Sequence, residues 1–256
     1  MLVQSIRLLL LSLVVFYDVK CCCAQFQFNF TKLYVTTPAP LPFPKCVAVD
    51  IPCLRRGLRT FFFLMEAGHM GMKPVDPALI NSVVVAMPEK GVSMLLRNIN
   101  VTGAKWTKLA DRILNPFGTK SSVKFLSDLH VTGELTMSMA QLTTPLIASI
   151  TMDMQDVQSN ITYVLTGQST FNNDDYFIIG PERIAVRNSR MPTFFLQPDT
   201  EETRIIELVL QTNQSILDHL ANEVVVALMR NVVDNFRLFA SRVPIKHYYQ
   251  YVQTNP

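Results

Sequence analysis

Apolar residues change their spacing along the chain, and the first regular pattern covers residues 51–65. Here they recur at intervals of three and four residues, as Leu54, Leu58, Phe61, Phe62 and Met65. This spacing gathers apolar side chains on one face of a helix, and Pro52 suits a first helical turn. We predict an amphipathic helix that ends at Gly68 and Gly71. Its solvent-facing side carries Arg55, Arg56 and Arg59.

The middle of the chain changes to a composition typical of strands. Residues 83–87 and 92–101 are rich in β-branched and apolar residues, and the Pro-Glu-Lys-Gly segment between them favours a turn, so we predict a hairpin. Further strands are predicted at residues 123–131, 134–142, 146–154, 161–166, 176–179, 183–186 and 193–196. Because no helix is predicted between these segments, we expect an antiparallel sheet.

Residues 217–243 return to a helical pattern, and their apolar arc covers roughly half of the helical wheel or more, against the ~100° of a helix that lies on a core. This helix should therefore be largely enclosed. Its polar side, which we expect to face an opening or solvent, carries Glu223, Arg230, Asn231, Asp234 and Arg237. At 1.5 Å per residue the helix is about 40 Å long. The predicted fold is α+β: a long C-terminal helix wrapped by a strongly curved antiparallel β-sheet.

The N-terminal region has the composition of a targeting segment followed by an extended leader. Arg7 precedes an apolar run of about ten residues at 8–17, which is too short to cross a bilayer, and small residues follow at Cys22, Cys23 and Ala24. We predict a signal peptide over residues 1–24. Residues 25–45 contain prolines at every second position from Pro38 to Pro44, which prevents both helix and sheet. One domain is predicted over residues 46–250.

Two further features favour a secreted, extracellular protein. Four triplets match the acceptor pattern for N-glycosylation, at Asn29, Asn100, Asn160 and Asn213. Removal of the signal peptide would leave two cysteines, Cys46 and Cys53, and a secreted pair seven positions apart most simply forms one disulfide. No retention signal ends the chain, and no second apolar run of membrane-spanning length lacks a charge.

Charge and motif content exclude several classes of function. A formal net charge of +3 in 256 residues provides no basic footprint for nucleic acid. The four histidines are not spaced as metal ligands, and the sequence contains none of the common hydrolase, phosphate-loop or dinucleotide motifs. Two adjacent carboxylate pairs, at residues 174–175 and 201–202, lie in polar stretches that we predict to be solvated loops. We expect no enzyme, no metal and no cofactor.

Large, soft apolar side chains point to a different function. The chain contains 12 Met and 16 Phe, many of them in the segments that would line the interior. Methionine adapts to irregular shapes, which suits a pocket for a flexible lipid-like molecule, although the same residues could simply fill a core. A curved sheet around one helix encloses more space than the helix fills. The candidate ligand-binding residues are Phe61, Met65, Met72, Val225, Met229, Val232 and Phe236.

Several of these features occur together in one known family. The two cysteines, the helix after them, Gly71-Met72, Val75-Asp76-Pro77, the segment Asn98 to Gly103 and a late helix ending near Val243-Pro244 resemble the insect haemolymph juvenile hormone binding protein and takeout family. The resemblance implies a secreted carrier, in which a curved antiparallel sheet wraps a long helix and leaves a tunnel for a terpenoid or fatty-acid-like ligand. It also implies that Cys46 and Cys53 match the family's N-terminal disulfide.

Two hypotheses follow. In the first, the protein is a secreted carrier that binds a small hydrophobic ligand in an internal apolar tunnel, with one or two polar side chains orienting the head group. In the alternative, it is an extracellular glycoprotein that acts as a protein-interaction module, with a filled core and no ligand. A continuous apolar cavity of several hundred Å³ would favour the carrier. In neither hypothesis is the partner a nucleic acid, and no membrane span is expected.

Overall fold

The computed structural model describes residues 42–47, 49–113, 120–140, 142–169 and 174–250. The chain divides into two compact units, residues 1–41 and 42–256, and all the described residues belong to the second. The predicted signal peptide at residues 1–24, and residues 25–41 of the predicted leader, lie outside the described residues. The domain boundaries proposed above therefore stay predictions.

The described part contains three long helices, four short 3₁₀ turns and seven strands. The helices are α2 (Ile51–Glu66), α3 (Glu201–Thr212) and α4 (Gln214–Arg242). The strands are β1 (Ala78–Met87), β2 (Val92–Thr102), β3 (Lys108–Ile113), β4 (Lys120–Met139), β5 (Leu146–Ser169), β6 (Asp175–Asn188) and β7 (Thr193–Gln197). The predicted helices at 51–65 and 217–243 and the predicted hairpin are all confirmed.

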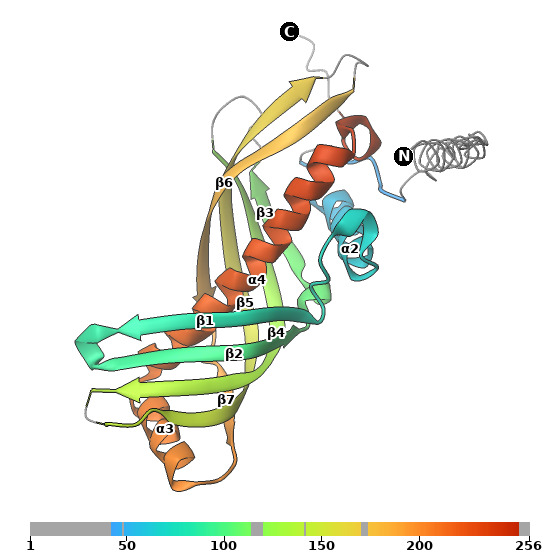
Figure 1. Ribbon diagram of the computed structural model, residues 1–256. Coiled ribbons are helices and arrows are strands. Elements are labelled where there is room, and N and C mark those ends of the chain that lie inside the picture. Colours follow the sequence, from blue (N-terminus) through green and yellow to red (C-terminus); the bar gives the residue numbers. More distant parts are fainter. Residues whose placement is uncertain (1–41, 48, 114–119, 141, 170–173, 251–256) are drawn as a thin grey trace, which may run out of the picture. The chain divides into compact units, whose positions relative to one another are not determined.

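The seven strands form one antiparallel sheet in the order β1-β2-β4-β5-β6. The long strands β4 and β5 hold the sheet together because each pairs with different neighbours along its length. β4 pairs with β3 through its first residues and with β2 through its last, while β5 pairs first with β7 and then with β6. The sheet thus has two ends, one made by β1, β2 and β7 and the other by β3 and β6, joined through β4 and β5 (Figure 1).

Irregular backbone positions bend the sheet where its two ends meet. The pairing of β4 with β5 shifts register after Ser127, and the backbone N–H of Asp156 donates to the Asp128 carboxylate across this bulge at 2.8 Å. The pairing of β2 with β4 shifts between Arg97 and Asn100. Bulges increase local twist and bend the strands that carry them. The sheet can therefore curve without losing its pairing at either end.

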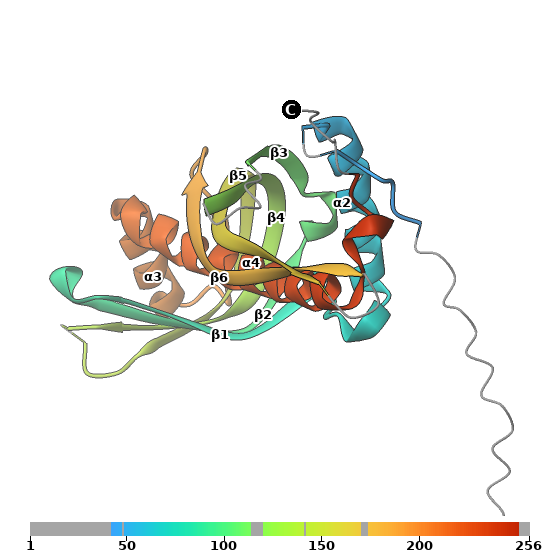
Figure 2. The same cartoon turned by 90° about the horizontal axis from the view of Figure 1, so that it is seen from above.

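The curved sheet passes around α4. This helix contacts β1 and β6, which stand at opposite ends of the strand order, and it also contacts β5. Figure 2 shows α4 lying beneath the arch of β4 and β5 with β1 and β2 on its other side. Thirteen of its residues are buried, among them Leu220, Val224, Leu228 and Val232, each with no exposed surface. The predicted α+β fold, a long helix wrapped by a curved antiparallel sheet, is confirmed.

Six of the seven further strand predictions named only parts of longer elements, or divided them, and the seventh, residues 193–196, corresponds to β7. Residues 123–131 and 134–142 belong to β4, which continues through Gly133 and ends at Met139. Gly133 suits a strand here because a Cβ at this position would lie 3.0 Å from the carbonyl oxygen of Arg97. The segments 146–154 and 161–166 both belong to β5, and the segments 176–179 and 183–186 both belong to β6. Polar residues that face outward interrupt the sequence pattern without ending the strand.

Two elements were not predicted at all. One is β3, which has only six residues and follows a 3₁₀ turn. The other is α3, whose first turn contains the Glu201-Glu202 pair that we expected in a loop. Thr200 and Thr203 cap this helix through their side chains, and Ile206 and Leu210 bury its inner face. The two glutamates are exposed, and carboxylates are favourable near a helix N-terminus.

The N-terminal and C-terminal ends of the described chain meet beside α2. The Asp50 carboxylate caps this helix by accepting from the backbone N–H of Cys53 at 2.9 Å. Cys46 and Cys53 form a disulfide with their Cα atoms 5.6 Å apart. Cys46 also pairs with the C-terminal segment, because the backbone N–H of Gln250 donates to its carbonyl oxygen at 2.9 Å. One short crosslinked segment therefore connects α2 to the chain that follows α4.

Candidate ligand-binding cavity

An apolar cavity lies where α2 and the second half of α4 face the end of the sheet made by β3 and β6, together with neighbouring parts of β4 and β5. Its volume is about 180 Å³, and the empty space between its walls is about 1070 Å³ when the open mouth is counted. The first volume has room for roughly a dozen water-sized groups. The lining residues are Phe43, Pro44, Cys46, Leu54, Gly57, Leu58, Phe61, Leu109, Arg112, Val123, Phe125, Ile161, Tyr163, Leu165, Phe177, Ile179, Val233, Phe236, Phe239, Ala240 and Tyr248.

Aromatic rings in contact with one another build the helical wall of the cavity. The ring of Phe61 on α2 stacks on Phe236 of α4, with centroids 4.1 Å apart and planes 8° apart, and it meets Phe239 edge-on at 5.4 Å. Phe239 also contacts Phe43 and Tyr248, at 4.9 and 5.3 Å. Such pairs add about 0.5–1.5 kcal/mol each beyond area burial. The rings therefore hold one another in place at the edge of the empty space.

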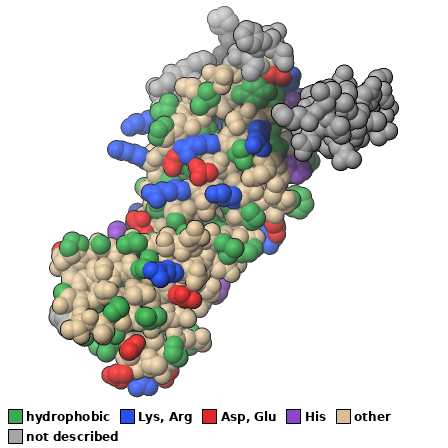
Figure 3. All heavy atoms as spheres, in the orientation of Figure 1, with side chains coloured by type: hydrophobic (Ala, Val, Ile, Leu, Met, Phe, Trp, Pro, Cys, Tyr) green, Lys and Arg blue, Asp and Glu red, His purple; other side chains and the backbone are tan. Residues whose placement is uncertain are grey.

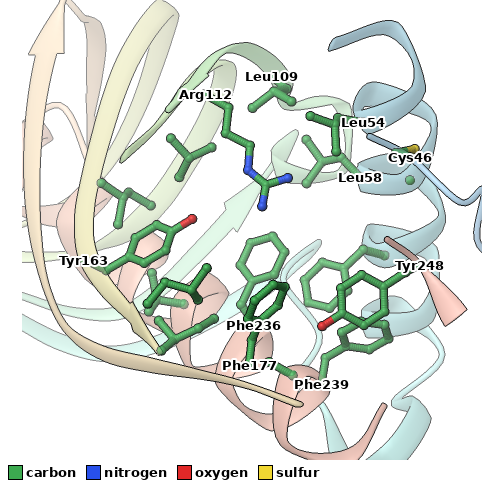
Figure 4. Close-up of a pocket in the computed structure, with 18 of the residues that line it drawn as sticks. Cys46, Leu54, Leu58, Leu109, Arg112, Tyr163, Phe177, Phe236, Phe239 and Tyr248 are labelled. Carbon is green, nitrogen blue, oxygen red and sulfur yellow. The ribbon is translucent and has the colours of Figure 1, made fainter. Parts of the chain in front are cut away.

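Three polar side chains interrupt this apolar lining. Figure 4 shows the guanidinium of Arg112 and the hydroxyls of Tyr163 and Tyr248 among the rings and aliphatic side chains. Arg112 comes from β3, Tyr163 from β5, and Tyr248 from the segment after α4. A mainly apolar pocket with a few polar groups is typical of sites that bind a small hydrophobic molecule and orient its head group.

The structure brings together only some of the candidate ligand-binding residues. Phe61 and Phe236 line the cavity and stack on each other. Met65, Met72, Val225, Met229 and Val232 are all buried, with 0–3% of their surface exposed, but they are not among the residues that line this cavity. On α4 the lining begins at Val233. The residues before it lie towards the end of the helix that β1 and β2 enclose.

Sequence reasoning missed most of the lining. The strand residues Val123, Phe125, Ile161, Tyr163 and Leu165 alternate along β4 and β5, and this period-2 pattern could have indicated one inward face. No pattern indicated Arg112, because β3 itself was not predicted and its local period is broken by a bulge. The contribution of residues 43–46 depends on long-range pairing with the C-terminal segment.

One ion pair and two hydrogen bonds to backbone oxygens hold α4 against β6 next to the cavity. Arg237 forms ion pairs with Glu182 and Asp234 and donates to the carbonyl oxygens of Ile179 and Gly180. Burial disfavours the charged form of Glu182, but the hydrogen bond from Arg237 and its positive charge outweigh this, so the pKa of Glu182 is lowered. Basic and acidic side chains lie together on the face shown in Figure 3. The predicted exposed side of α4 is thus partly a contact with the sheet.

A second polar contact fixes the other side of α4. Asn235 is 2% exposed, and its amide donates to the Lys73 carbonyl oxygen at 2.8 Å while its oxygen accepts from the Lys73 N–H at 2.9 Å. The same amide approaches the sulfur of Met65 at 2.9 Å. This buried residue lies between Asp234 and Phe236, and it attaches α4 to the segment after α2. The cavity is therefore bordered by a helix that is anchored on two sides.

The predicted glycosylation sites differ in their surroundings. Asn160 and Asn213 are exposed, whereas Asn100 is half-buried in β2 and its side-chain oxygen is enclosed, with no hydrogen-bond partner among the described residues. Asn29 lies outside the described residues. Modification of all four sites stays a prediction, and the exposed pair are the more accessible acceptors.

Within the described ranges, no group of three or more His, Cys, Asp or Glu side chains could hold a metal ion. His130 and Asp153 form an exposed pair on the sheet, 2.6 Å apart, away from the cavity lining. Asp174, from the first predicted carboxylate pair, forms an ion pair with Lys246.

Comparisons with known proteins agree with this architecture. No protein-family model matches the chain. The juvenile hormone-binding protein of Manduca sexta is 23% identical over 177 residues, which make up 63% of this chain and 76% of that protein. The crystal structure of Takeout 1 from Epiphyas postvittana matches 81% of this chain and 99% of that one, with a TM-score of 0.68 and 15% identity. In sequence the chain is thus similar to a juvenile hormone-binding protein, and in fold it is similar to Takeout 1. It shares the wrapped-helix fold of Takeout 1, and none of its described helices is both long and apolar enough to span a membrane.

Proposed function

We propose that this protein is a secreted carrier that binds a small hydrophobic ligand, a juvenile-hormone-like terpenoid or a fatty-acid-like lipid, in the cavity between α2, α4 and the sheet. The observation that carries the proposal is an apolar cavity walled by four separate parts of the chain. Transfer of a ligand's apolar surface out of water contributes about 25 cal/mol per Å² before the costs of association. Binding of this kind requires no catalytic group.

The cavity shows that the core is not completely filled, as the alternative hypothesis would require. Its volume of about 180 Å³ is smaller than the several hundred Å³ that we expected, and the larger figure of about 1070 Å³ includes open solvent at its mouth. A ligand larger than roughly a dozen non-hydrogen atoms would extend into the mouth. The name of the Manduca sexta relative, a hormone-binding protein, supports the same class of function.

Secretion is supported by two features of the chain. The N-terminal 24 residues have the pattern of a signal peptide. The disulfide between Cys46 and Cys53 is of a kind that persists in oxidising compartments. Cys46 lines the cavity, so the crosslink that favours an extracellular location also supports the binding site.

The experiment uses the mature, disulfide-bonded protein and the fluorescent apolar probe N-phenyl-1-naphthylamine. We expect saturable fluorescence enhancement that a natural lipid extract competes away. Gly57 supplies the matched variants, because it lies within α2 and a Cβ there would meet only Pro44, at 3.7 Å. Gly57→Phe should lower probe affinity at least tenfold by filling the cavity, whereas Gly57→Ala should keep the affinity and stabilise the helix by about 0.5–1 kcal/mol.

Two results would contradict the carrier function. One is a wild-type protein that shows no saturable probe signal. The other is a signal that Gly57→Phe leaves unchanged while its circular dichroism spectrum and thermal unfolding match those of Gly57→Ala. The second result would place probe binding elsewhere on the protein.

A further inference from the structure

Arg112 points into an apolar cavity because of a local irregularity in β3. The pairing of β3 with β4 shifts register between Leu109 and Asp111, so Ala110 is the extra residue of a bulge. Without a bulge, residues 109 and 112 would face opposite sides of the sheet, since strand side chains alternate. With it, Leu109 pairs with Phe125 and Arg112 pairs with Val123, and all four side chains line the cavity.

The charge of Arg112 has no acidic partner in the part of the chain that the structure describes. The only Asp or Glu next to it, Asp111, is exposed, and its carboxylate accepts from the backbone N–H of Arg112 rather than from the guanidinium. The sequence outside the described ranges contains a single acidic residue, Asp18, within the predicted signal peptide. A half-buried guanidinium at the edge of an apolar cavity is therefore not committed to an acidic side chain of the described residues and can pair with an anionic group of a ligand.

The surroundings of Arg112 define which ligand group would supply that compensation. A guanidinium carries five N–H donors in a planar fork that matches the two oxygens of a carboxylate. Tyr163 also lines the cavity, on the next strand but one, and Figure 4 shows its hydroxyl and the guanidinium on the same side of the cavity as Leu109. Below them lie the carbon surfaces of Phe177 and Phe236, together with the hydroxyl of Tyr248. The guanidinium, the only charged group of the lining, thus stands at one side of a mainly apolar cavity.

We propose that the cavity selects amphiphiles with a carboxylate head group, such as medium-chain linear or branched acids, and that Arg112 binds the carboxylate while the phenylalanine rings enclose the chain. This inference rests on the proposed carrier function and gives it a ligand class: an acid is favoured over its neutral ester. Arg112 is a specificity-determining residue, because the ester retains all the apolar contacts and loses only the ion pair.

Another reason for an inward-facing charge is protection of a sheet edge. β3 is an edge strand in the described sheet, and charged residues that point inward discourage pairing with other chains. In that case Arg112 would have no preference among ligands. The two roles therefore differ in a quantity that can be measured, the ratio of acid affinity to ester affinity.

The experiment measures displacement of N-phenyl-1-naphthylamine at pH 7.4 by decanoate and by methyl decanoate, and by a branched acid and its methyl ester. Decanoate has a size that matches the enclosed volume. In the wild-type protein we expect each acid to bind at least tenfold more tightly than its ester. Arg112→Gln should bring that ratio close to one by weakening the binding of each acid more than that of its ester, and Arg112→Lys should retain part of the preference.

Arg59→Gln is the matched control, since Arg59 is exposed on α2 and does not line the cavity. It should keep the wild-type ratio. Equal affinities of acid and ester in the wild-type protein, or an unchanged ratio in Arg112→Gln, would overturn the carboxylate proposal but leave the carrier function standing. If Arg112→Gln does not fold, an unchanged ratio in Arg112→Lys at raised ionic strength overturns it. A wild-type protein that binds no probe overturns the carrier function itself.

Discussion

The two ends of the wrapped sheet use different side chains, and the apolar cavity described above lies at one of them. At the end made by β1, β2 and the paired parts of β4 and β5, six large residues have at most 2% of their surface exposed: Met94, Leu96, Leu135, Met137, Ile150 and Met152. We call this the filled end. At the open end, the walls carry stacked aromatic rings around empty space. Both ends share the same helix, α4.

The difference indicates that methionine helps to fill the space at one end, whereas leucine occurs at both ends. Methionine can adjust several torsions until voids disappear, and interiors pack to crystal-like density when they can. A phenylalanine ring is flat and has two side-chain torsions. The ring of Phe61 stacks on Phe236 and meets Phe239 edge-on. Movement of these rings into the cavity would break these contacts.

The largest expected effect comes from truncating the filled end. Leu220→Ala should lower the free energy of unfolding by about 2–5 kcal/mol, because Leu220 has no exposed surface and its removal creates a void. Leu58→Ala at the open end should cost only about 1–2 kcal/mol, because Leu58 already borders empty space. Urea denaturation followed by circular dichroism measures both. Equal losses would show that the two ends pack alike.

The same two substitutions should affect probe binding in the opposite order: Leu58→Ala should have the larger effect and Leu220→Ala the smaller. Leu220→Ala should leave probe affinity within about twofold of the wild type, while Leu58→Ala should change it, since only Leu58 lines the cavity. A loss of affinity in the Leu220 variant, at a urea concentration where it remains folded, would mean that the filled end contributes to the site.

Removal of the disulfide should have the next largest effect on stability, and the effect should be concentrated at the open end. Replacing Cys46 and Cys53 together by serine should lower the free energy of unfolding by roughly 2.5 kcal/mol, because the loop that the disulfide closes is short. Probe affinity should fall as well, since Cys46 and its neighbour Pro44 line the cavity. Hydrogen exchange should rise in α2 and leave β1 and β2 unchanged. Hydrogen exchange that rises equally in α2, β1 and β2 would contradict a local stabilising role of the disulfide.

The smallest expected effect concerns the contact between α4 and β6. The pKa of Glu182 is lowered in the folded state from its ordinary value of 4.5. The ionised carboxylate therefore stabilises the folded protein fully at pH values above 4.5, and this stabilisation is lost as the pH falls through the folded-state pKa. Glu182→Gln should therefore lower the free energy of unfolding by about 1 kcal/mol at pH 7 and by less at acidic pH. Unfolding curves from pH 7 to pH 3 measure this difference.

Asp199→Asn is the control for that pH dependence. Asp199 pairs with Arg204 at 3.0 Å, and the hydrogen bond from Arg204 lowers its pKa, but both side chains are exposed. Its substitution should change stability less than Glu182→Gln does, because solvent screens exposed pairs. A larger effect at Asp199 would contradict the view that Arg237 anchors α4 to the sheet.

Much of the fold could be predicted because it depends on local periodicity. Residues 51–65 and 217–243 have three- and four-residue spacing, and they form α2 and α4. The ends of the strands were harder to predict, since a mainly polar run such as residues 155–160 resembles a loop but continues β5. The short element β3 could not be found by period, because a bulge at Ala110 breaks its alternation.

For the candidate site, the sequence by itself determined the wide apolar arc of α4, the pair of cysteines and the supply of large apolar side chains. Only the tertiary structure decided which of those side chains border empty space. The reason is that burial depends on a residue's own polarity, whereas a cavity depends on what every neighbour leaves unfilled. Phe236 and Val232 are both apolar residues of one helix, yet Phe236 meets Phe61 beside the cavity and Val232 is fully buried without lining it.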